Sequence, residues 1–128
     1  MRRFNVFGVE VVIYKNRSSM CRAAKKFKFN TSDNIEAGVL PVNHKGILAL
    51  MFLHESITIP ALVHEALHAA LVIIRHYNPK SRRHQEEIIA YTQTVLVQEI
   101  LKRFNFPRNS DYEFHSFSEL VDWIKSSY

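Results

Sequence analysis

The chain has little cysteine, glycine or proline. Its 128 residues include one cysteine, three glycines and four prolines. The single cysteine, Cys21, excludes an internal disulfide framework and favours a reducing compartment. So few glycines and prolines leave little room for long flexible linkers, and the length suits one domain, which we take to span residues 1–128.

Long hydrophobic runs are missing as well. The longest apolar run near the middle of the chain, residues 46–53, is far shorter than the roughly 20 residues that cross a bilayer. The positive N-terminus, Met1–Arg3, is followed by polar residues and by no small-residue cleavage site, so it does not resemble a secretion signal. We therefore expect a cytoplasmic protein without a membrane anchor.

The first part of the chain, residues 1–55, has the pattern of a strand-rich region. Val9–Tyr14 is rich in β-branched residues, and residues 39–42 and 47–53 flank a turn at residues 43–46, which together predict a hairpin. Pro41 makes the first arm of that hairpin an edge strand. Two further elements are a short helix at Ser18–Lys25 and a half-buried strand at Lys26–Phe29.

The remainder, residues 59–126, has helical periodicity. Thr58 is a suitable N-cap for a first helix, which Asn78-Pro79 ends. Ser81 begins a second helix that runs to about Phe104, and Ser116–Glu119 forms a capping box before a short third helix. The fold class is therefore α+β: a small, mostly antiparallel sheet packed on two long helices, with a short C-terminal helix.

One motif in the first helix carries chemistry, His64-Glu65-Ala66-Leu67-His68. Two histidines four residues apart lie on one helix face, where both imidazoles can bind a single metal ion. Glu65 lies about 100° around the helix, so its carboxylate can reach a metal-bound water rather than the metal. Two histidines and one carboxylate leave a fourth position open, as in catalytic zinc sites, and we expect Zn²⁺.

The third metal ligand is expected from the second helix, at Glu86 or Glu87. Measured along the helix axis from the turn between the two helices, His68 lies about 13 Å away and Glu87 about 9 Å away. This mismatch is less than one helical turn, and Glu87 is nearer than Glu86, which we interpret as a solvated surface charge. Tyr91 lies closer still in depth and is expected to border the site.

The sequence His64-Glu65-x-x-His68 followed by Glu87-x-x-Ala90 resembles the gluzincin branch of zinc metallopeptidases. It is most similar to the small metallopeptidases encoded in phage genomes, which would place the protein in the host cytoplasm. The resemblance covers roughly residues 47–100 and implies that the two histidines and the downstream glutamate bind zinc while Glu65 is the general base. Many gluzincins carry an aspartate directly after the alanine, where this chain has Tyr91.

The expected reaction is hydrolysis of a peptide bond by a zinc-bound water that Glu65 deprotonates. We expect the strand at residues 47–53 to offer its edge to an extended protein or peptide substrate, with Leu50, Phe52 and His54 lining the cleft. A second donor must stabilise the oxyanion. Tyr91 is one candidate, and the others are His76, His84, Tyr112 and His115.

A competing hypothesis rests on charge. Residues 1–45 contain nine lysines and arginines against three acidic residues, whereas the rest of the chain sums to −1. Arg22, Lys25, Lys26 and Lys28, together with two phenylalanines, suit a phosphate-binding face. In this alternative the chain is a catalytically weak or inactive metal-binding protein that acts through a basic nucleic-acid-binding or protein-binding face.

Overall fold

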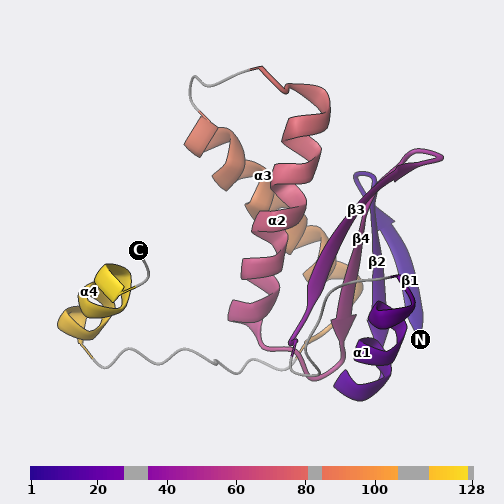
Figure 1. The fold of residues 1–128 in the computed structure, drawn as a ribbon, viewed down its shortest axis with the longest axis horizontal. Coiled ribbons are helices and arrows are strands. Elements are labelled where there is room, and N and C mark those ends of the chain that lie inside the picture. Colours follow the sequence, from indigo (N-terminus) through magenta and orange to yellow (C-terminus); the bar gives the residue numbers. More distant parts are fainter. Residues whose placement is uncertain (28–34, 81–84, 107–115, 127–128) are drawn as a thin grey trace.

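The computed structural model describes residues 1–27, 35–80, 85–106 and 116–126. Within these ranges the chain forms four strands and four helices (Figure 1). The strands are β1 (Arg2–Val6), β2 (Val9–Tyr14), β3 (Gly38–His44) and β4 (Ile47–His54). The helices are α1 (Arg17–Lys26), α2 (Ile59–Tyr77), α3 (Gln85–Arg103) and α4 (Phe117–Ser126).

The four strands form one sheet in the order β1-β2-β4-β3. The pairs β1–β2 and β3–β4 are antiparallel hairpins, and the central pair β2–β4 is parallel. The predicted α+β class and the mostly antiparallel sheet are thereby confirmed. β3, which contains Pro41, lies at the edge as predicted, because a residue without an N–H group is tolerated best there.

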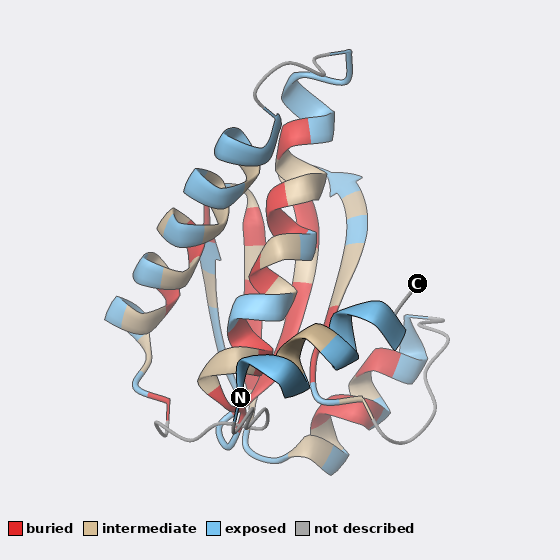
Figure 2. Ribbon diagram, turned by 90° about the vertical axis from the view of Figure 1, so that its left-hand side faces the viewer, coloured by how far each residue is buried: buried red, intermediate tan, exposed pale blue. Residues whose placement is uncertain are grey.

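Helices cover both faces of the sheet. Alternate side chains along a strand point to opposite faces, and Val11, Ile13, Met51 and Leu53 belong to the core shared with α2 and α3. Phe52 packs instead with buried residues of α1 on the other face. Figure 2 shows the buried residues concentrated in the central strands and on the inner sides of the helices.

α2 begins and ends where the sequence predicts. The Thr58 hydroxyl accepts a hydrogen bond from the Ala61 N–H at 3.3 Å, and Pro60 occupies the first turn, where its missing N–H costs nothing. Asn78 caps the C-terminus. The buried side chains of α2 follow helical spacing and face the sheet and α3: Ala61, Leu62, Ala66, Ala69, Ala70 and Ile74.

α3 runs back along α2 in the antiparallel direction (Figure 1). Its Gln93 side-chain amide donates a 2.8 Å hydrogen bond to the Val63 carbonyl oxygen of α2. This contact fixes the register of the pair. Because the helices are antiparallel, a residue six positions before Gln93 on α3 lies level with the residue six positions after Val63 on α2. Leu96 and Ile100 bury the inner side of α3 in the common core.

Two details of the first third differ from the sequence-based expectation. The predicted strand at Lys26–Phe29 is wrong for its first two residues, because α1 continues through Lys26 and Phe27 is its C-cap; residues 28 and 29 lie outside the described ranges. Burial of Met20, Cys21 and Ala24 at helical spacing outweighs the short charged–aromatic alternation. No strand is predicted at residues 2–6, where the structure has β1. Phe7 and Gly8, both with positive φ, form the tight turn that joins β1 to β2.

α4 differs from the other helices because none of its residues is buried. The Ser116 hydroxyl accepts a hydrogen bond from the Glu119 N–H at 3.2 Å, as the capping box predicts. The predicted cap of the second helix, Ser81, lies outside the described residues. Of the described helices, none combines the length and apolar character required to cross a bilayer.

The cap at Thr58 provides a test of how α2 is held. We expect Thr58→Ala to lower the free energy of unfolding by about 1 kcal/mol, because the Ala61 N–H loses its acceptor. Thr58→Ser keeps the hydroxyl and should retain most of the stability. Urea denaturation followed by circular dichroism measures both, and an alanine variant as stable as the wild type would show that the cap contributes nothing.

Candidate metal centre and cleft

The two histidines of the motif converge on the outer side of α2. Their Nε2 atoms lie 3.3 Å apart, and the ring planes are inclined by 72° with centroids 5.0 Å apart. Two nitrogens that each bind zinc at about 2.0–2.1 Å with a tetrahedral angle between them lie about 3.3 Å apart. The His64–His68 pair therefore has the spacing that a tetrahedral metal site requires.

Glu65 completes a compact cluster. The ligand atoms of His64, Glu65 and His68 all lie within 4.8 Å of one another, and no other group of metal-binding side chains of this size exists among the described residues. The two imidazoles are exposed and Glu65 is half-buried. Exposed imidazoles beside a half-shielded carboxylate suit a site that is open to a substrate on one side.

Burial raises the pKa of Glu65 above its ordinary value, and the nearby charges of His68 and His64 oppose this shift only in part. A carboxylate with a raised pKa is a stronger base than an exposed one. This property suits the role of proton acceptor that the motif predicts for Glu65.

The cluster opens into a cleft of about 360 Å³ between α2 and the edge strand β3. Glu65 and His68 line it on the α2 side. The other lining residues of α2 are Leu71, Val72 and Arg75, and those of β3 and its lead-in are Ala37, Gly38, Val39 and Pro41. The lining is thus mostly apolar, with Glu65 and His68 nearer the start of α2 and Arg75 farther along the helix.

The three residues predicted to contact substrate do not lie in this cleft. Within the described sheet β4 is central, with β2 on one side and β3 on the other, so it offers no edge to a peptide. Leu50 and Phe52 pack against α1 on the opposite face of the sheet. The prediction for these residues is wrong because periodicity identifies alternate faces of a strand but not which face meets which helix.

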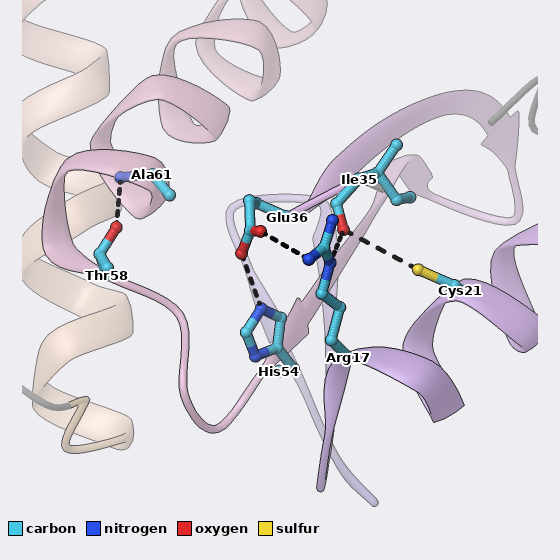
Figure 3. A network of polar contacts seen from close by, with 7 residues as sticks. All are labelled: Arg17, Cys21, Ile35, Glu36, His54, Thr58 and Ala61. Atoms are coloured by element: carbon cyan, nitrogen blue, oxygen red, sulfur yellow. Dashed lines mark hydrogen bonds and ion pairs between the residues drawn. The ribbon is translucent and has the colours of Figure 1, made fainter. Parts of the chain in front are cut away.

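His54 also lies away from the cleft. It is buried, with 4% of its surface exposed, and its Nε2 lies 3.5 Å from a Glu36 carboxylate oxygen (Figure 3). Its prediction as a substrate-contacting residue is wrong for the same reason. Leu50, Phe52 and His54 are alternate residues of β4, so their side chains lie on the sheet face that α1 covers.

Glu87 is not brought into the His64–Glu65–His68 cluster. It is exposed near the start of α3 and lines a separate shallow depression with Ile88, Tyr91 and Thr92. The Gln93–Val63 hydrogen bond nevertheless places Glu87 about level, along the helix pair, with Ala69, which follows His68 in the sequence. Glu87 is therefore near the level expected of a third ligand, although its carboxylate is not part of the cluster.

Two of the remaining oxyanion candidates lie in the described part of the chain, Tyr91 and His76. Tyr91 is 74% exposed on α3. His76 lies in the last turn of α2 against the Tyr77 ring, with centroids 4.8 Å apart. His84, Tyr112 and His115 lie outside the described residues, and so does the predicted basic residue Lys28. Glu86 is exposed, as expected.

Sequence reasoning missed the wall of the cleft formed by Ala37, Gly38 and Val39. One signal could have found it: Pro41 indicated an edge strand, and an edge strand beside the motif helix is the surface on which an extended chain can pair.

Comparisons of the chain with protein-family models, with curated proteins and with solved structures find no match in any of the three.

The pKa of Glu65 predicts a pH-dependent cost in the metal-free protein. Because the folded-state pKa is raised, the carboxyl is tolerated best when protonated, and stability falls as the pH rises through the folded-state pKa. We expect Glu65→Gln to raise the melting temperature of the metal-free protein at neutral pH and to leave it nearly unchanged below about pH 3, where the carboxyl is protonated in both states.

Calorimetry in the presence of a chelator measures this difference. Glu99→Gln is the matched control, because Glu99 lies in a surface ion pair with Lys102 on α3. A Glu65→Gln protein that melts lower than the wild type at neutral pH would contradict a partly buried, disfavoured carboxylate.

Proposed function

We propose that the chain is a zinc-dependent metallopeptidase in which His64 and His68 bind the metal and Glu65 is the general base. The observation that carries the proposal is the 3.3 Å separation of the two Nε2 atoms beside a carboxylate with a raised pKa. When bound, zinc supplies a Lewis acid that polarises a carbonyl group and lowers the pKa of water. We propose Glu87 as third ligand because its depth on α3 matches that of His68.

In this proposal the cleft binds an extended segment of a protein or peptide along β3. No strand pairs with the outer edge of β3 among the described residues, so its backbone groups can add one more strand. Such pairing is independent of the substrate's side chains and would lay a peptide bond beside His68 and Glu65, which line the same cleft. The Glu65 carboxylate takes a proton from the attacking water and returns it to the leaving amine.

We place the protein in the cytoplasm, of the host cell if the source is a phage. This proposal rests on the reducing compartment that the cysteine content favours and on the resemblance of the motif to phage metallopeptidases.

A second candidate function is binding of nucleic acid through α1. The exposed side of this helix carries Arg22, Lys25 and Lys26, and it lies on the sheet face opposite to the His64–His68 pair. A cationic helix of this kind attracts a phosphate backbone. In this alternative α2 and α3 have only a structural role, and zinc-loaded protein would bind polyanions while cleaving no peptide.

The role of Glu65 is tested by Glu65→Gln in zinc-loaded protein. We expect unchanged zinc stoichiometry and a kcat lower by about 10²–10⁴-fold on a fluorogenic peptide library, because the proton acceptor is lost while the ligands remain. Glu99→Gln serves again as the control and should keep full activity. A zinc-loaded wild type that cleaves nothing in the library would overturn the proposal, as would a Gln variant with full activity.

The third ligand is tested by comparing neighbouring carboxylates on α3. We expect Glu87→Ala to weaken zinc binding by more than about 100-fold, since loss of groups that only support a ligand already costs about 10–100-fold. Glu86→Ala removes an exposed carboxylate one residue away and should leave the affinity unchanged. Competition with a zinc-binding dye measures both constants, and the opposite result would assign the ligand to Glu86.

A further inference from the structure

A polar network lies on the sheet face opposite to the cleft, at the end of the sheet where β4 stops. The Glu36 carboxylate contacts two cationic or protonatable partners at once (Figure 3). One oxygen lies 3.1 Å from the Arg17 guanidinium, and the other lies 3.5 Å from Nε2 of His54. The Arg17 Nε–H also donates a 2.8 Å hydrogen bond to the Ile35 carbonyl oxygen.

The network gathers three elements that are distant in the sequence. Arg17 is the first residue of α1, His54 is the last residue of β4, and Glu36 precedes β3. Gly38 pairs with Phe52 in the antiparallel β3–β4 ladder, so the same register continued by two residues places Glu36 opposite His54. The Glu36–His54 contact is made by side chains just beyond the last ladder partner, where Glu36 lies in a bend.

The burial of His54 makes this contact more than a surface ion pair. His54 is 4% exposed, and neither ring nitrogen has a hydrogen-bond partner of ordinary geometry in the described structure. A buried polar group without such a partner is costly, which favours any arrangement that keeps the Glu36 carboxylate close. The side chain of Glu36 is half-exposed, so it can be replaced without opening a cavity in the core.

The network is coupled to the cleft because two consecutive residues, Glu36 and Ala37, contact opposite faces of the sheet. Glu36 points to the face of α1, whereas its neighbour Ala37 is buried in the core on the α2 face. Ala37, Gly38 and Val39 form one wall of the cleft that Glu65 and His68 line on the other side. Holding Glu36 in place on one face therefore fixes the position of the wall on the other.

We propose that Glu36, held between Arg17 and His54, is a positioning residue that sets the edge of β3 at the distance from α2 at which an extended peptide binds in the cleft. This role rests on the proposed peptidase function and adds to it a determinant of substrate binding that lies outside the cleft. Glu36 acts through the backbone of residues 37–39 and touches neither metal ligands nor substrate.

The experiment compares Glu36→Gln with Glu10→Gln in zinc-loaded protein. Glu10 pairs with Arg3 at 3.5 Å at the other edge of the sheet, so its variant breaks an ion pair without reaching β3. We expect Glu36→Gln to raise KM for a fluorogenic peptide about fivefold, the factor for one partly exposed ion pair, with kcat and zinc stoichiometry unchanged. Glu10→Gln should change none of these quantities.

Arg17→Gln and the double variant with Glu36→Gln identify the route of the effect. Because both residues act through the same contact, we expect the double variant to raise KM no further than the single ones. A lower kcat with unchanged KM, or additive effects of the two substitutions, would overturn the proposal.

Hydrogen exchange keeps this proposal separate from the proposed function. The β3 amides that pair with β4 should exchange about fivefold faster in Glu36→Gln than in the wild type or Glu10→Gln. If the wild type cleaves no peptide, the peptidase proposal fails while the exchange result still decides whether Glu36 holds the edge. Equal exchange of β3 in both variants would show that it does not.

Discussion

The packing of α2 against the sheet is the constraint on which the rest of the site depends. Leu62, Ala66 and Ala70 are fully buried, and this stripe fixes the rotation of the helix about its own axis. With 3.6 residues per turn, that rotation directs His64 and His68 away from the core and places His68 and Glu65 along the cleft beside β3. The same apolar contacts that stabilise the fold thus determine what the motif can reach.

Position along the helix also controls the electrostatics of Glu65. Partial burial disfavours its ionised form, and the two neighbouring imidazoles compensate only in part. An ionised carboxylate at this position is therefore expected to cost stability. Such a cost is common where a group is held for its chemistry, because a base must be ready to accept a proton.

The elements of the helical half were predictable from sequence because their signals are local and agree with each other. Thr58, the apolar stripe and Asn78-Pro79 all indicate the same helix, and the hairpin before it has its turn at Lys45-Gly46. Long-range arrangement was less accessible. Nothing in residues 47–54 indicates that β2 pairs with β4 in parallel, and that pairing is what removes the edge expected of β4.

The same limit applies to the site. The His64–Glu65–His68 cluster follows from spacing within one helix, so sequence alone predicts it. The depth of Glu87 was also predictable from the length of two antiparallel helices, but the direction of its side chain depends on the rotation of α3. The Glu36–His54 contact joins β4 to the segment before β3 and has no local signature at all.

In the proposed function, the two imidazoles of α2 bind one zinc ion together. X-ray absorption at the zinc edge of protein loaded with one equivalent of zinc tests this claim, because it counts and identifies the ligand atoms. We expect two imidazole nitrogens at about 2.0–2.1 Å with oxygen ligands completing the shell, and loss of one imidazole in His68→Ala. A zinc ion without imidazole ligands, or a spectrum that His68→Ala leaves unchanged, would contradict the claim.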